Sequence, residues 1–198
     1  MTTPNPNKKR SAWYVVLGLI VGFGFGAREY LDRPAQQAAT IQTAVDDDKA
    51  VNARARLLQQ QLAQIMGRPT STIDDYIANM RAASPAVEEA KGLVRLQMAS
   101  VARKRQQHPE GSPDATAFEY AQRLLGKDEE LIYLMSDEVH CGAALESMPG
   151  NARVAYYRTN VMPIEDKERQ VLNEWSNIAK EGQEKGVEWP ASVKQFSQ

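Results

Sequence analysis

The sequence predicts an all-α protein with one N-terminal transmembrane helix, followed by a long amphipathic helix and a helical bundle or hairpin domain. Three observations carry this prediction. Residues 11–27 hold no charged side chain, residues 34–66 carry apolar side chains at helical spacing, and residues 70–184 repeat that spacing between short breaks. A chain of 198 residues has room for one ordinary domain and an anchor.

The apolar segment at residues 11–27 has the length and the flanks of a membrane span. Its 17 residues would form a helix of roughly 26 Å, near the lower end for crossing the hydrocarbon core. Trp13 and Tyr14 lie at one end, where amphipathic rings favour the headgroup level. Arg28 lies at the other end, where its side chain could snorkel to the interface. We therefore expect a transmembrane anchor.

The basic tail at residues 1–10 sets the expected orientation. Basic residues beside a span tend to stay in the cytoplasm, so the N-terminus is expected inside and the rest of the chain outside. A cleaved signal peptide has the same basic and apolar beginning and remains an alternative. A cut after Ala27 would put the large Phe25 at a position that requires a small residue, which favours the uncleaved anchor.

Three glycines of the anchor recur at every fourth residue. Gly18, Gly22 and Gly26 would share one helix face and let two backbones approach closely in the bilayer. This spacing would allow pairing with a second copy of the chain. The alternative is that glycine is simply common in membrane helices, and Gly24 lies off this face.

Residues 34–66 carry a heptad-like seam and end before Gly67, a usual helix stop. The strongest seam residues, which we name as the interaction seam, are Val51, Leu58, Leu62 and Ile65. Two interpretations compete. The helix is either an isolated coiled-coil stalk or the first helix of a bundle whose later helices cover the seam, and the second is favoured because more amphipathic helices follow.

The first half of the helical domain at residues 70–184 is expected to contain two helices. Thr72 precedes acidic residues and begins a short helix that ends near Ala83. Ser84 and Pro85 then provide an N-cap and a first helical residue for a second helix.

The second half begins after a loop rich in proline and glycine at residues 108–113. A helix from Pro113 is expected to stop at Gly126, and Asp128 is expected to cap another, so that the two form an antiparallel hairpin. Residues 153–161 are expected to be an extended connection or a short helix. Pro163 begins the last helix, and a C-terminal tail follows at residues 185–198.

Charge and cysteine content exclude some classes of protein. The chain has a net charge of −1, and all three basic residues of its first 27 residues lie in the N-terminal tail, so the remainder is acidic and is not expected to bind nucleic acid. A single cysteine excludes an intrachain disulfide and a cysteine-rich zinc site. We expect no cofactor.

The most concentrated candidate for chemistry is the group Asp137, His140 and Cys141. On a helix, His140 and Cys141 point about 100° apart, so they cannot form the thiolate–imidazolium contact of a cysteine nucleophile. The favoured interpretation is that Cys141 is a small buried structural residue, while Asp137, Glu138 and His140 are solvated.

These observations favour a scaffold, a tether or a subunit of a cell-envelope complex over an enzyme. The expected partners are the membrane and other proteins, including a second copy of the chain, and the expected location is a bacterial inner membrane with the helical domain in the periplasm. Two alternatives stay open: a periplasmic enzyme or binding protein that uses the region from Asp137 to Cys141, and a phage-type lysis protein that spans the envelope with an extended coiled coil.

Overall fold

The computed structural model describes residues 35–189, with side chains from residue 48 onward. Every regular element in this range is a helix, which confirms the all-α prediction. The elements are α2 (Ala35–Met66), α3 (Ile73–Gln106), α4 (Pro113–Ser147), α5 (Gly150–Tyr156), the π-helix η3 (Tyr157–Val161) and α6 (Met162–Glu184). The predicted anchor and its residues lie outside the described range. Within that range, no helix combines the length and apolar character that crossing a bilayer requires.

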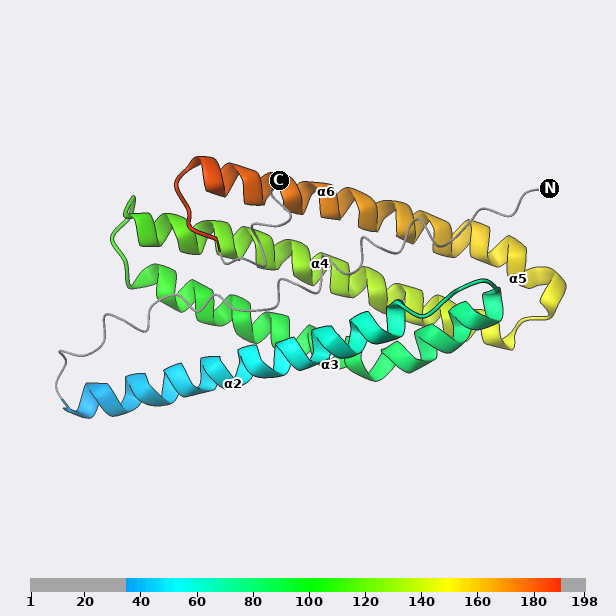
Figure 1. Ribbon diagram of the computed structural model, residues 1–198, viewed down its shortest axis with the longest axis horizontal. Helices are drawn as coiled ribbons and strands as arrows, with labels where there is room; N and C mark the ends of the chain where they lie inside the picture. Colours follow the sequence, from blue (N-terminus) through cyan, green and yellow to red (C-terminus); the bar gives the residue numbers. More distant parts are fainter. Residues whose placement is uncertain (1–34, 190–198) are drawn as a thin grey trace.

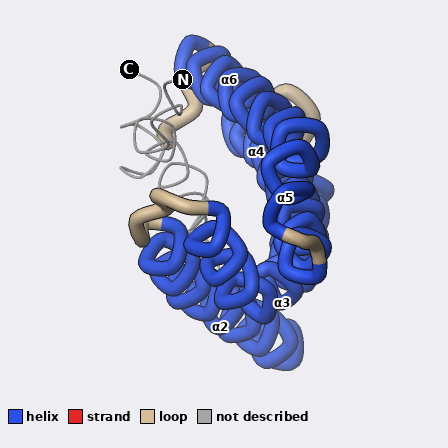
Figure 2. Tube along the Cα trace, turned by 90° about the vertical axis from the view of Figure 1, so that its right-hand side faces the viewer, coloured by secondary structure: helices blue, strands red, loops and turns tan. Residues whose placement is uncertain are grey.

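The four long helices run up and down in an antiparallel row (Figure 1). The main packed pairs are α2 with α3, α3 with α4, and α4 with α6. Seen along the helices, the row is curved and follows the order α2, α3, α4, α6 (Figure 2). Helix α5 begins after the turn that ends α4 and continues through η3 directly into α6. The first and last of these helices therefore form the two edges of the row.

Helix α2 ends at Met66, as the sequence predicts, and its seam packs against other helices of the same chain. Leu58, Leu62 and Ile65 are buried in one core with residues of α3 and α4, and Val51 packs against that core. The bundle interpretation is thus confirmed for these residues. An isolated stalk is not formed here, because α3 covers the seam.

Helix α3 begins as predicted but is one helix rather than two. The Thr72 side chain accepts a hydrogen bond from the Asp75 N–H, and the Asp75 carboxylate accepts one from the Thr72 N–H, which completes a capping box. The predicted restart at Ser84 is wrong, since α3 continues through Pro85 to Gln106. An internal proline costs about 3 kcal/mol. The buried residues of α3 before and after Pro85 pack on α2 and α4, and this packing offsets the cost.

Helix α4 also joins two segments that the sequence separates. Ser112 caps it and Pro113 begins it, as expected, but it runs through Gly126 to Ser147. The predicted hairpin across Gly126 is therefore wrong, and the antiparallel hairpin is formed by α3 and α4 around the loop at 107–112. A glycine inside a helix costs only about 1 kcal/mol, less than the continuous apolar stripe contributes. Asp128, which the sequence predicts as a helix cap, instead lies in the middle of α4, and its side chain is buried.

One glycine brings α3 and α4 close together. A Cβ on Gly142 would lie 2.7 Å from the Cβ of Met80, closer than two side chains can approach. Glycine at this position therefore sets the separation of the two helices.

Residues of the predicted C-terminal tail at 185–198 pack on the last helix, α6. After Gly186, whose φ of +82° suits glycine, the chain folds back on α6. The Trp189 indole N–H donates to the Ala179 carbonyl at 2.8 Å, and the ring packs so tightly on Gly182 that no other residue fits there. The described part of the tail is therefore ordered by contacts to α6.

Candidate functional site

The structure places the three predicted site residues on the last third of α4. Asp137 and His140 are exposed, whereas Cys141 is half-buried and lies 4.0 Å from the Tyr156 hydroxyl. Cys141 thus meets a tyrosine of α5 and not the neighbouring histidine. Glu138, which the sequence places in solvent, is only 2 % exposed, so that expectation is wrong.

The environment of Cys141 favours a protonated thiol. Burial raises its pKa most, and the charges of Glu138 and Asp137 raise it further, while the hydrogen bond with Tyr156 acts in the opposite direction. A cysteine nucleophile needs a lowered pKa, because the thiolate is the reactive form. The site therefore lacks the electrostatics of nucleophilic catalysis.

A buried tyrosine connects this region to α3. Tyr76 packs edge to face on Tyr157, with ring centroids 5.3 Å apart, and its hydroxyl donates to the Glu138 carbonyl at 3.3 Å. Burial, together with the negative charge of Glu138, raises the pKa of Tyr76, so the phenol stays neutral. Tyr157 in turn donates to the Glu165 carboxylate at 2.6 Å. We name these residues the Tyr76 cluster: Tyr76, Glu138, Cys141, Tyr156, Tyr157 and Glu165.

The π-helix η3 lies directly beside the Tyr76 cluster and has a local cause. The Thr159 hydroxyl donates to the Ala155 carbonyl at 2.9 Å, and the Asn160 amide donates to the Tyr156 carbonyl at 3.1 Å. These side chains occupy carbonyls that would otherwise accept from the backbone, which bends or widens a helix. Single π-turns are often found at functional sites, which makes the cluster the leading candidate in the described chain.

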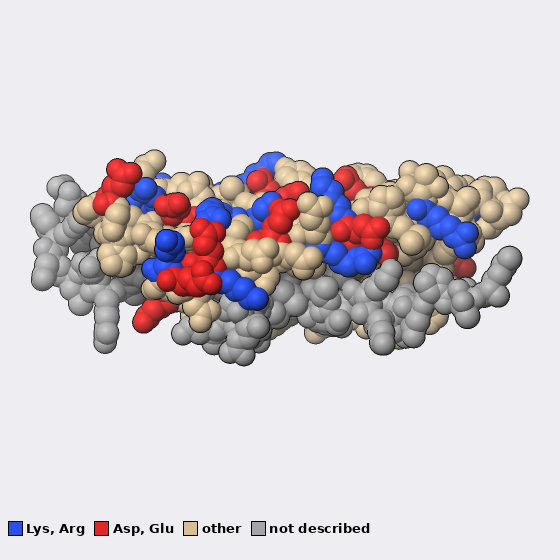
Figure 3. All heavy atoms as spheres, turned by 90° about the horizontal axis from the view of Figure 1, so that it is seen from above, with Lys and Arg blue, Asp and Glu red and all other residues tan. Residues whose placement is uncertain are grey.

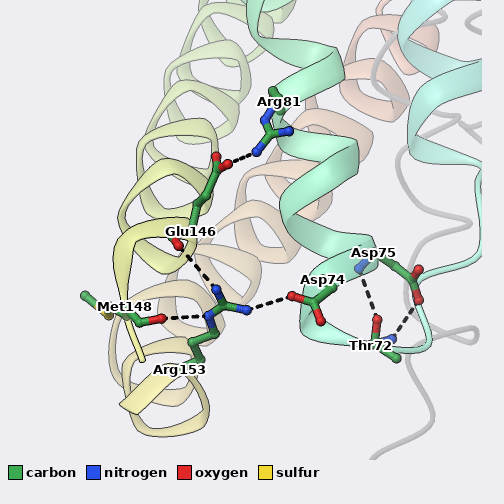
Figure 4. Close-up of polar contacts among 7 residues, drawn as sticks. All are labelled: Thr72, Asp74, Asp75, Arg81, Glu146, Met148 and Arg153. Atoms are coloured by element: carbon green, nitrogen blue, oxygen red, sulfur yellow. Dashed lines mark hydrogen bonds and ion pairs between the residues drawn. The ribbon is translucent and has the colours of Figure 1, made fainter. Parts of the chain in front are cut away.

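Arg153 holds this end of the row together (Figure 4). Its guanidinium donates to the carbonyls of Met148 and Glu146 at 3.0 and 3.2 Å, where α4 ends with unsatisfied acceptors. It also pairs with Asp74 of α3 at 2.7 Å. Arg81 pairs with the Glu146 carboxylate a few residues along (Figure 4). Arg153 therefore acts as a clamp between α5, the end of α4 and the start of α3.

A second polar region lies between α2 and α3. Asp48 pairs with Lys104 at 2.7 Å, and the Gln97 amide donates to Asn52 at 2.9 Å. These residues line a cleft of about 20 Å³ together with Ser100 and apolar neighbours. A volume of this size has room for about one water molecule, so the cleft fits hydration of a polar interface better than a substrate.

Taken together, the arrangement holds polar groups in place and does not activate them. Burial raises the pKa values of the Tyr76 and Tyr156 phenols and of the Cys141 thiol, and the Tyr76 and Tyr157 hydroxyls donate to acceptors within the cluster. Across residues 48–189, no three side chains of the metal-binding types come together as a metal site would need. Sequence reasoning missed Glu138, Tyr76 and Glu165 as members of the cluster, because their contacts join helices far apart in the chain.

Comparison of the chain with protein-family models, with curated proteins and with solved structures found no match. The function must accordingly be argued from the chain's own residues.

Proposed function

We propose that this chain is a single-pass membrane protein whose helical region serves as a scaffold, tether or subunit of a cell-envelope complex and has no catalytic role. The observation that carries the proposal is the apolar segment at residues 11–27, which has a basic tail before it and aromatic and basic residues at its ends. The proposed orientation has the N-terminus in the cytoplasm and the helical row in the periplasm of a bacterial inner membrane.

The start of α2 supports this arrangement. Helix α2 begins at Ala35, eight residues after Ala27, and its 32 residues extend for roughly 48 Å. A helix that begins so few residues after an anchor would keep the row of helices near the bilayer. Because α2 packs on α3 through residues from Val51 onward, α2 belongs to the same packed row as the other long helices.

The surface chemistry supports a protein partner rather than a nucleic acid. On the face seen in Figure 3, acidic and basic side chains alternate and no single sign dominates. Ion pairs also join helices in the described part of the chain, such as Lys127 with Glu174 and Arg123 with Glu181. A nucleic-acid surface would need an excess of basic residues on one face.

The partner surface we propose is no longer the predicted interaction seam. Leu58, Leu62 and Ile65 are used inside the chain, so a partner would have to contact other residues. Four large apolar side chains remain exposed in the described part of the chain, and aromatic and aliphatic residues of this kind supply anchors in interfaces. They are Leu57, Leu96, Tyr133 and Val154.

A charge in the apolar segment provides the test of the anchor. The wild-type chain should remain in the membrane fraction after alkaline carbonate washing and be released by detergent. Leu19→Arg places a charge near the middle of the segment, at a cost of about 2.5–3.5 kcal/mol for insertion. It should move much of the protein to the soluble fraction, as measured by immunoblotting of both fractions.

The matched control is Leu57→Arg, the same substitution at a side chain that is 56 % exposed in the folded region. It should fractionate like the wild type. Intact-mass measurement of the membrane-bound protein distinguishes an uncleaved anchor from a cleaved signal peptide. Wild-type protein in the soluble fraction, or a mass that lacks the residues up to a cleavage site such as that after Ala27, would contradict the proposal.

A further inference from the structure

Asp128 is a buried carboxyl group of α4, between the residues of α4 that pack on α6 and those, Leu125 and Ile132, that pack in the core shared with α3. It is 1 % exposed, and neither carboxylate oxygen has a hydrogen-bond partner. One turn away on each side, Leu124 packs with Trp175 and Leu131 packs with Val171. Asp128 therefore lies between the two apolar clusters that hold α6 on α4.

Trp175 of α6 lies in the same part of the interface, because it shares a cluster with Leu124, one turn before Asp128. The Trp175 indole N–H is also buried without a partner. A buried donor and a buried acceptor in this part of the interface are thus both unsatisfied, an arrangement that costs free energy and is rare in stable interfaces.

The cations of the interface are already paired. On α4, Lys127 pairs with Glu174 and Glu130, and Arg123 pairs with Glu181. On α3, Arg95 pairs with Glu129. The residues that follow Asp128 on α4, Glu129 and Glu130, are acidic and supply no counter-charge for its carboxylate.

We propose that Asp128 makes the docking of α6 onto α4 sensitive to pH, with α6 docked while the carboxyl is protonated and released when it ionises. The geometry carries this inference: a carboxyl group enclosed by apolar contacts, without a hydrogen bond or a free cation, cannot hold a negative charge and stay enclosed. Ionisation requires water to reach Asp128, and α6 must separate from α4 to admit it.

The direction of the effect follows from proton binding. Burial raises the pKa of Asp128 well above its ordinary value, whereas in the open state the group returns to a pKa of about 4. Between these two values the docked state binds one more proton than the open state. Docking is therefore most stable at low pH and weakens as the pH rises, with the opening equilibrium constant increasing about tenfold per pH unit. The weakening ends above the pKa of the docked state.

Hydrogen exchange of the full chain in detergent micelles tests the proposal. Exchange is followed by mass spectrometry at pH 5, 6, 7 and 8 and corrected for the intrinsic rate at each pH. Protection of peptides from α6 should fall about tenfold per pH unit up to the raised pKa, while peptides from α3 should keep their protection. Unchanged protection of α6, or an equal loss in α3, would overturn the proposal.

Substitutions assign the effect to Asp128. Asp128→Asn keeps the shape of the side chain and cannot ionise, and Asp128→Leu removes the polar group, so each should abolish the pH dependence in α6. The matched control is Asp137→Asn, an exposed carboxylate on the same helix, which should retain the wild-type dependence. If both Asp128 variants kept the wild-type dependence, another group would be responsible and the proposal would be wrong.

Discussion

Replacing Leu62 by aspartate is expected to separate α2 from α3, with a loss of about 3–5 kcal/mol in the free energy of unfolding. Leu62 is 0 % exposed and lies in the core that joins α2, α3 and α4. The substitution removes an apolar side chain and buries a carboxylate with no counter-charge. Denaturant unfolding of the full chain in detergent, followed by circular dichroism, measures the loss.

The control for this experiment is Leu57→Asp, five residues earlier on the exposed side of α2. Leu57 is 56 % exposed, so the same change should alter the free energy of unfolding by no more than about 0.5 kcal/mol. Equal losses for the two variants would show that the seam is not covered within the chain. The stalk interpretation would then regain its support.

The second large effect is expected at the α6 edge of the row. Trp175 is 0 % exposed and packs with Leu124, Ala179 and Trp189. Trp175→Ala should cost about 3–5 kcal/mol, since it removes a fully buried indole ring from this cluster and leaves a cavity. In a protein of this size, each kcal/mol lowers the melting temperature by about 2–4 °C, and calorimetry or thermal circular dichroism provides the measurement.

Trp175→Phe separates packing from hydrogen bonding. The indole N–H of Trp175 has no partner, so phenylalanine loses no hydrogen bond and retains a ring in the cluster. The expected cost is below about 2 kcal/mol. A loss as large as that of Trp175→Ala would mean that the indole nitrogen makes an interaction that the described structure does not contain.

The helical class and several helix ends could be predicted from local signals, whereas the number of helices could not. The capping pattern at Thr72 and the Ser-Pro start at residue 112 each placed a real N-terminus, because caps act within one turn. Pro85 and Gly126 gave equally clear local signals for boundaries, but the helices continue through both. Packing along a continuous apolar stripe outweighs a local cost of about 1–3 kcal/mol.

The candidate site was less predictable because its contacts join distant parts of the chain. The grouping of Asp137, His140 and Cys141 rested on proximity in sequence, and the structure brings only Cys141 towards the buried cluster. Tyr76 meets Glu138 sixty-two residues later, a pairing fixed by how α3 packs on α4. The burial of Asp128 and Glu138 likewise depends on neighbouring helices, and charged residues are rarely buried, so sequence reasoning places them in solvent.

The most direct test of the proposed role is crosslinking in intact cells. A photoreactive amino acid is placed at Leu57 or Leu96, both more than half exposed, and at the buried Leu62 as a control. A membrane-anchored scaffold should give an adduct of defined mass from at least one exposed position, none from Leu62, and none when Leu19→Arg removes the anchor. The absence of adducts from both exposed positions, together with recovery of a monodisperse, partner-free protein from the soluble fraction, would contradict the account.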